Sequence, residues 1–425
     1  MIAKEELGRR LKVARENAGF TQEEVAQRLE ITRGALAQIE GGIRAPNSLH
    51  LARLAEIYGR EVGDFLRGDF DESQQDALAV LFRADATLAR DLSQAAVIRG
   101  YANLCREYTT LEALLGLDHD RIYPVVYKVP PPRTRWEAIR QGERLAELER
   151  SRLSLGDGPI RDMVEVQEPQ GIHVLEVSLP NHISSLFLND RRYGLSIIVN
   201  ADHHARRQRF SYAHEYCHVL ADRDHASLVS KAENRQDLVE VRANAFAAAF
   251  LMPADGVRAW LRAIGKGEAS RSTLQVFDEA FDEVGAVVGQ KRADAHSQDL
   301  QVYDVARLAH HFGVSYETAL YRLLNLKIIS DEELRRFKEQ QELANHLRQL
   351  LEPEPPQGPQ RARAFAHRFL FLALEAYRRE AISRGKLREL CDLLRDITPD
   401  QLDDLILSLE ERMEHGPEPI YIPGE

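Results

Sequence analysis

The stretch FSYAHEYCHVLAD, residues 210–222, decides the fold of the chain around it. It contains no proline, and its pattern predicts a helix near 209–221. His214 and His218 stand four residues apart, so on that helix both imidazoles project to one side. Two imidazoles on one face can bind a single metal ion, and Glu215, about 100° further round the axis, lies beside that ion. The stretch therefore predicts a helix built around a metal centre.

The pattern in this helix is HExxH. In this arrangement two histidines and a third residue hold the ion, a water fills the remaining position, and the glutamate takes a proton as the water attacks a carbonyl group. With 15 His and 67 acidic residues among 425, random placement would produce H-[DE]-x-x-H fewer than about 0.1 times per chain. The sequence therefore indicates a metal-dependent hydrolase.

The third ligand is expected on the next helix, which is predicted over 233–251. Glu240 lies 22 residues after His218, and its neighbours Ala243, Ala247 and Ala248 are small, so the two helices can pack closely. Asp224 is the alternative, in the frame HExxHxxGxxD. That frame needs a glycine at the turn where this chain has Ala221, and a left-handed turn is unfavourable for any other residue. We therefore favour Glu240 over Asp224.

Strands are predicted before the metal-binding helix. The runs IHVLEV, SSLFLND and LSIIVN predict strands at 172–177, 184–190 and 195–200, after a helix at 136–150. Beyond the second helix an all-helical stretch is expected to about residue 345. Proline-rich segments at 123–132 and 352–360 mark linkers, and 362–412 is predicted to be helical. The predicted fold class is therefore multidomain and mainly α, with one small β-sheet.

Residues 4–67 predict a run of short helices, two of which begin with the same kind of cap. Thr21 caps the helix QEEVAQRL, with Glu24 completing a capping box, and Thr32 caps the helix RGALAQIE. The turn 29–31 between them is so short that the helices must meet at a steep angle, which is helix-turn-helix geometry. One face of the second helix is left free to enter a DNA groove.

Over residues 11–59, LKVARENAGFTQEEVAQRLEITRGALAQIEGGIRAPNSLHLARLAEIYG, the chain resembles the XRE (Cro/repressor) family of helix-turn-helix domains. The resemblance implies a five-helix domain that binds double-stranded DNA, usually as a homodimer on a pseudo-palindromic operator. The helices of 71–117 are candidates for pairing the two copies. The resemblance also implies phosphate contacts by Gln22 and Arg44 and base-edge contacts by Arg33, Gly34, Ala37 and Gln38. Because Arg33-Gly34 replaces the usual Ser or Gln, the operator sequence is not carried over.

A second resemblance covers residues 135 to 327. HEYCH, E-x-x-A-N-x-F-A-A from Glu240 to Ala248, and Leu-Met-Pro at 251–253 resemble the ImmA/IrrE family of zinc metallopeptidases. The segment VYDVARLAHHFGVSYETALYRLLNL (302–326) resembles the helix-turn-helix-like element behind such peptidases. The resemblance implies that His214, His218 and Glu240 bind zinc, with manganese as the alternative ion, and that Glu215 is the general base. Members of the family cleave repressors after DNA damage or in phage-related and mobile-element switching.

Composition limits the compartment and the partners. Lys+Arg number 56 against 67 Asp+Glu, a net charge of −11, so DNA must be met by a local surface. The charges of 1–70 are about balanced. Three cysteines, Cys105, Cys217 and Cys391, cannot form a disulfide framework and indicate a reducing compartment. No run approaches the roughly 18 apolar residues that span a bilayer. A cytoplasmic protein without a membrane partner is predicted.

Several residues near the HExxH pattern are given structural interpretations. Cys217 is interpreted as a small buried side chain and not as a thiolate ligand. His203 and His204 are interpreted as solvated loop residues, and Arg206, Arg207 and Arg209 as a solvated helix entrance. Tyr212 and Tyr216 are interpreted as packing residues.

The sequence thus predicts four parts. They are an N-terminal helix-turn-helix domain (1–70), a helical connector with a proline-rich linker (71–130), an α+β zincin-like peptidase domain (131–345) with a trailing helix-turn-helix-like element (302–330), and a helical C-terminal region without a predicted role (362–425). The predicted function is a DNA-binding transcriptional regulator fused to a zinc endopeptidase that cleaves a repressor or itself in a stress, phage or mobile-element response. The alternative is a transcription factor whose zincin-like domain is a non-proteolytic sensor or dimerisation module.

Overall fold

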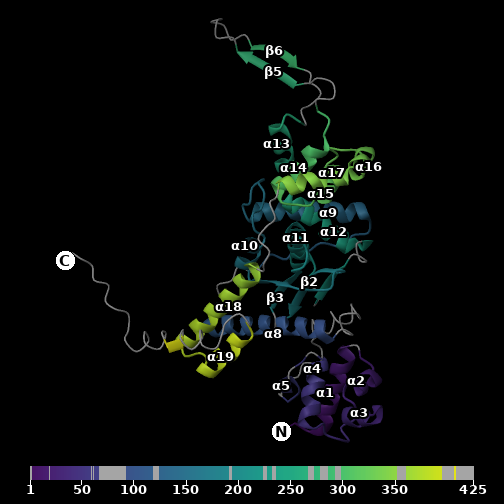
Figure 1. Ribbon diagram of the computed structural model, residues 1–425, viewed down its shortest axis with the longest axis vertical. Helices are drawn as coiled ribbons and strands as arrows, with labels where there is room; N and C mark the ends of the chain where they lie inside the picture. The colour runs from purple at the N-terminus through teal and green to yellow at the C-terminus, as the bar shows by residue number, and fades with distance from the viewer. Residues whose placement is uncertain are drawn as a thin grey trace, which may run out of the picture.

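The computed structural model shows a helix-rich chain with a small mixed β-sheet near its centre (Figure 1). The residues that it describes are 2–18, 20–58, 60, 62–66, 92–117, 124–190, 194–223, 227–231, 236–266, 272–277, 286–291, 298–351, 360–394 and 406–407. The predicted fold class, mainly α with one central sheet between an N-terminal helical domain and C-terminal helices, is confirmed. Within these ranges no helix is long and apolar enough to cross a bilayer.

The N-terminal part contains five helices, as predicted. They are α1 (Lys4–Asn17), α2 (Gln22–Arg28), α3 (Arg33–Glu40), α4 (Ser48–Tyr58) and α5 (Val62–Leu66). The side chain of Thr21 accepts from the Glu24 amide, and the Glu24 side chain accepts from the Thr21 amide, which completes the predicted capping box. Thr32 caps α3 by accepting from the amide of Ala35. Both caps hold the helix-turn-helix geometry that the sequence predicted.

The central sheet has four strands in the order β1-β3-β2-β4. The strands are β1 (Ile172–Val177), β2 (Ile183–Asp190), β3 (Gly194–Asn200) and β4 (Ser227–Lys231). β1 pairs parallel to β3, and β2 pairs antiparallel to both β3 and β4. The first three strands match the predictions within one residue. β4 was not predicted, because SLVSK is short and lacks a clear alternation of apolar and polar residues.

One face of the sheet is covered by α11 (Ala205–Ala221), which contacts β2 and β3. α12 (Leu238–Leu251) packs on α11, and α9 (Arg135–Arg152) packs on α12. The short helices α10 (Val164–Gln167) and η1 (Glu168–Gln170) precede β1. α9 and α12 approach closely at Gly142, where a Cβ atom would lie 2.3 Å from the carbonyl oxygen of Arg242. α11 begins at residue 205, four residues before its prediction, because His204 caps it. α12 begins at 238 instead of 233.

The other face of the sheet is covered by α8 (Leu92–Leu115) and α18 (Gln360–Arg378), and α19 (Arg384–Asp392) packs against α18 (Figure 1). Tyr108 of α8 stacks on Phe365 of α18 with ring centroids 5.0 Å apart, and both belong to one buried cluster with Leu186 and Ile198 of the sheet. Residues predicted as a connector and as a C-terminal region therefore complete the central core together. The apolar face of α8 is buried within its own chain.

The prediction of an all-helical stretch to residue 345 is wrong at one place. Between α13 (Ala254–Ala263) and α14 (Val302–Phe312) lies a hairpin of β5 (Ser272–Phe277) and β6 (Ala286–Lys291). Each of the segments STLQVF and AVVGQK contains two β-branched residues, which favour extended backbone, and the two strands pair with each other over six residues. α15 (Tyr316–Asn325), α16 (Asp331–Glu339) and α17 (Gln341–Leu351) follow as helices.

The helix-turn-helix-like element of 302–330 packs against other helices of the same chain. α14 and α15 flank a turn in which Gly313 has a φ of +64°. Arg322 of α15 is buried and donates to the carbonyl oxygen of Met252 at 2.9 Å and to Glu143 at 2.6 Å. Its second helix therefore packs against α9 and the end of α12. The predictions for 71–91, for the linker at 352–359 and for the segment after 394, apart from 406–407, lie outside the described residues.

Candidate functional site

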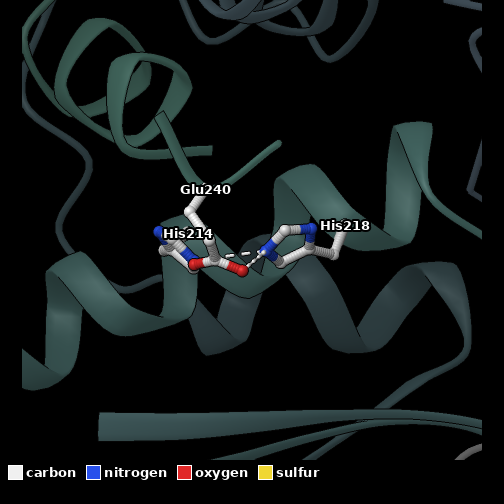
Figure 2. A group of neighbouring side chains, drawn as sticks. All are labelled: His214, His218 and Glu240. Atoms are coloured by element: carbon white, nitrogen blue, oxygen red, sulfur yellow. Dashed lines mark hydrogen bonds and ion pairs between the residues drawn. The ribbon is translucent and has the colours of Figure 1, made fainter. Parts of the chain in front are cut away.

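Two facing helices bring three predicted ligands together. His214 and His218 lie on α11, and Glu240 lies near the start of α12 (Figure 2). Their donor atoms all lie within 4.8 Å of one another, and all three side chains are buried. Asp224, the alternative ligand, lies outside the described residues. The packing of α12 against α11 therefore places Glu240 opposite the histidine pair.

The spacing of the three donors fits a tetrahedral metal ion. Two ligand atoms that each lie 2.0–2.1 Å from zinc at the tetrahedral angle are separated by about 3.3 Å. In the structure His214 Nε2 lies 3.2 Å from His218 Nε2 and 3.1 Å from Glu240 Oε2, and His218 Nε2 lies 3.6 Å from Glu240 Oε1. Two imidazole nitrogens and one carboxylate are donors that zinc takes in catalytic sites with an open position. The residues therefore fit the ion.

The opposite nitrogen of each ring is held by an oxygen. His218 Nδ1 lies 2.9 Å from Asp222 Oδ2, and His214 Nδ1 lies 3.1 Å from Asn244 Oδ1. An ionised carboxylate only accepts, so His218 Nδ1 carries a hydrogen, and Nε2 is the ring nitrogen left to bind an ion. Asp222 in turn accepts from the buried Arg242 of α12. These contacts fix the ring orientations before any ion binds.

These supporting residues were not predicted from the sequence, although the spacing of two of them is a signal. Asp222 lies four residues after His218, and Asn244 lies four residues after Glu240, so each pair shares one helix face. Arg242 gives no comparable signal, because its contact with Asp222 crosses from α12 to α11.

The electrostatics keep both carboxylates charged. Burial raises the pKa of Glu240, but its hydrogen bond to His214 and the charges of both histidines outweigh burial and lower that pKa below its ordinary value. Burial likewise opposes the charge of Asp222, while His218 and Arg242 lower the pKa of this carboxyl group. The predicted ligand Glu240 and the carboxylate of Asp222 are therefore both ionised at neutral pH.

Asp222→Asn is expected to lower zinc affinity by about 10- to 100-fold. The amide keeps the shape of the carboxylate but loses its charge, so it orients His218 less strongly and leaves Arg242 without its anionic partner. Competition with a chromogenic chelator measures the affinity directly. Asp255→Asn on exposed α13 makes the same chemical change away from the site, and its zinc affinity should equal that of the unmodified chain. Equal affinities in all three proteins would contradict the supporting role of Asp222.

Glu215 lies beside the three donors and is fully buried. The hydroxyl of Ser185 on β2 donates to Glu215 Oε1 at 2.6 Å. Ser185 was not singled out in the sequence, because its contact joins the sheet to α11 across 30 residues of chain. The predicted general base is thus held by the strand beneath the helix that carries it.

Two of the structural interpretations hold. Burial raises the pKa of the Cys217 thiol well above its ordinary value, so Cys217 is a neutral core residue. The hydroxyl of Tyr212 donates to Glu176 at 2.6 Å, and that of Tyr216 donates to Glu149, so both tyrosines link elements of the core.

The interpretation of the residues before α11 as solvated needs correction. His203 is 9% exposed and contacts Asn181 and Asn200, and Arg206 is 7% exposed against α14 and the turn that follows it. Arg206 donates to the carbonyl oxygen of Val314 at 2.9 Å. His204 is exposed but has a structural role as the N-cap of α11.

The residues predicted to meet DNA lie on α2, α3 and the turn that follows. Arg33, Gly34, Ala37 and Gln38 are all exposed on α3, at a spacing that gives them one face, and Arg44 is exposed beyond it. Gln22 differs, since it is half-buried and donates to Glu40 at 2.9 Å. Glu40 is buried in an ion pair with Arg15 at 2.7 Å. The side chain of Gln22 is therefore engaged within the domain.

Comparison with protein-family models matches residues 6–65 to a helix-turn-helix domain family and residues 167–280 to the IrrE N-terminal-like domain of peptidase family M78. The HTH-type transcriptional regulator ImmR of Bacillus subtilis (strain 168) is 36% identical to the chain over 75 residues. These residues are 18% of this chain and 58% of ImmR, so the chain spans little more than half the length of this relative. The chain therefore joins an XRE-type helix-turn-helix domain to an IrrE N-terminal-like domain of peptidase family M78, as the two resemblances in its sequence implied.

Proposed function

We propose that the protein is a DNA-binding transcriptional regulator that carries a zinc-dependent endopeptidase. The observation that carries the proposal is the buried group of His214, His218 and Glu240, with metal-ligand spacing, beside the buried carboxylate of Glu215. The match to the M78 family supports a peptidase, and the likeness to a transcriptional regulator supports a role in transcription. The proposed substrate is a repressor, or the chain itself, in a stress, phage or mobile-element response.

The side chains of this site suit peptide hydrolysis. The three ligands would hold a zinc or manganese ion, which would supply Lewis-acid polarisation of the scissile carbonyl group and lower the pKa of water. The Glu215 carboxylate accepts the proton from the attacking water and passes it to the nitrogen of the leaving amine. Ser185 holds that carboxylate through Oε1, and burial excludes bulk water from it.

The proposed partners and domain boundaries are those predicted from the sequence. The N-terminal domain would bind a pseudo-palindromic operator as a homodimer in the cytoplasm, with the base-facing and phosphate-facing residues named above. We retain the boundaries at 1–70, 71–130, 131–345 and 362–425 as proposals. One change concerns α8 and α18, which pack on the sheet of the proposed peptidase and belong with it structurally.

The proposed function is tested by incubating the purified full chain with zinc or manganese, with and without DNA, and identifying fragments by mass spectrometry. A purified phage-type repressor is the candidate substrate, and the chain itself is the second. Fragments that appear with metal, disappear with a chelator and return when zinc is added back are the expected result. Fragments that form equally with and without the chelator would contradict the proposal of a metallopeptidase.

Arg33→Ala is expected to weaken binding to a selected operator by about 10- to 100-fold, because a bidentate arginine–guanine contact contributes about 1–3 kcal/mol of discrimination. The operator is obtained by selection from random duplexes, and the affinities are measured by gel shift. Arg9→Ala on α1, whose guanidinium pairs with Glu6 at 2.6 Å, is the matched control and should leave the affinity unchanged. An unchanged affinity for Arg33→Ala would remove this residue from the base-reading face.

A further inference from the structure

A cavity of about 270 Å³ lies outside the candidate metal centre, between the start of α11, the α14–α15 pair and α17. These helices lie close together on the side of the molecule away from α8 (Figure 1). The polar lining that matters consists of His204, Arg206, Arg207, Glu317 and Arg348. The cavity is therefore formed by the start of α11 together with α14, α15 and α17, which follow α11 later in the chain.

The lining is strongly cationic. Three arginines face a single carboxylate, that of Glu317, and an arginine keeps its charge at every physiological pH. Two helix starts also line the cavity, since His204 is the N-cap of α11 and Ser315 is the N-cap of α15. The positive ends of both helix dipoles add to the charge of the arginines. The cavity is therefore suited to an anion.

Arg348 carries a second, independent signal. Its Nε atom is buried and makes no hydrogen bond within the described part of the chain. Its NH1 atom lies 3.3 Å from Nε2 of His204, another residue of the lining. A buried donor without an acceptor is rare in folded proteins and points to a group that completes the site. An acceptor entering the cavity would satisfy it.

We propose that this cavity binds a small molecule bearing a phosphate group. The planar guanidinium fork of arginine matches the oxygens of phosphate in two parallel hydrogen bonds. The volume of about 270 Å³ is at the small end of ligand pockets, which suits a phosphorylated metabolite of nucleotide size or less. A DNA backbone is disfavoured as the occupant, because Arg206 is only 7% exposed and the site is hollowed.

The cavity shares two elements with the candidate metal centre. Arg207 precedes His214 by seven residues on α11, which is about 10 Å along the helix axis. Arg207 also donates to Ser184 on β2 at 3.0 Å, and the next residue, Ser185, donates to Glu215. The proposed ligand site would thus be connected to Glu215 through α11 and through β2. Binding of the ligand does not depend on peptidase activity.

Isothermal titration of the full chain at constant ionic strength tests the proposal. The probes are inorganic phosphate, ribose 5-phosphate, adenosine 5′-monophosphate and, without phosphate, adenosine. Saturable binding of at least one phosphate probe, with no heat from adenosine, is expected, and the strongest probe separates a free anion from a phosphorylated metabolite. No saturation by any phosphate probe, or equal binding of adenosine, would overturn the proposal.

Variants locate the binding in this cavity. Arg348→Gln should weaken the best probe at least tenfold, while Arg335→Gln, an exposed arginine of α16, should bind it like the unmodified chain. Arg207→Gln, at an exposed position on α11, should give the same loss of affinity. If thermal unfolding shows that Arg348→Gln is not folded, Arg207→Gln alone tests the proposal. Unchanged binding in the folded variants would refute the assignment. The proposal would also be refuted if no small probe binds and the same variants lose affinity for random-sequence duplex DNA, because the occupant would then be nucleic acid.

Discussion

Replacing Glu215 by glutamine is expected to lower the rate of peptide cleavage by about 10²- to 10⁴-fold, the usual contribution of a general acid–base group. The amide has nearly the same shape and still accepts from Ser185, so the fold and the three metal ligands remain in place. It cannot take a proton from water at neutral pH, and it cannot return one to the leaving amine. The rate is measured as fragment formation by mass spectrometry, and bound zinc by elemental analysis.

A matched control makes this result specific. Glu165→Gln, an exposed carboxylate on α10, makes the same chemical change outside the site and should leave cleavage and zinc content unchanged. Cleavage at the original rate in Glu215→Gln would show that a contaminating protease forms the fragments. If the unmodified chain yields no fragment from any candidate partner and Glu215→Gln regulates transcription normally, the non-proteolytic sensor becomes the better account.

Gly142→Ala is expected to destabilise the peptidase core by about 3 kcal/mol, the upper part of the usual range for an overpacked core. The added Cβ would lie 2.3 Å from the carbonyl oxygen of Arg242 and 2.7 Å from the amide nitrogen of Phe246. Both are backbone atoms, so no side-chain rotation relieves the contact and α9 must move away from α12. Since α12 carries Glu240 as well, zinc affinity should fall together with stability.

Chemical denaturation followed by circular dichroism measures the stability change, and chelator competition measures zinc affinity. Gly100→Ala is the control, because Gly100 is also helical and a Cβ there meets no atom within 4 Å. That variant should be stabilised by about 0.5–1 kcal/mol through the better helix propensity of alanine. Equal shifts in the two variants would mean that α9 and α12 tolerate a wider separation than their packing indicates.

Much of the fold could be predicted because its signals are local. The helix caps at Thr21 and Thr32, the three strands before α11 and the pairing of two histidines on one helix face all depend on residues within a few positions of each other. β4 and the β5–β6 hairpin were missed for different reasons. β4 is defined by its pairing with β2, far away in sequence, and the hairpin lies in a region where helix was assumed.

By itself, the sequence determined the two domain families, the three strands before α11, the helices α11 and α12, and the residue types able to hold a metal ion. Only the tertiary structure decided which groups meet. It brought Glu240 to the histidines, set Arg242 on Asp222 and Ser185 on Glu215, and closed the second face of the sheet with α8 and α18. The physical reason is range: caps and helix faces are set by near neighbours, whereas packing between elements depends on the shapes of surfaces that only the folded chain brings together.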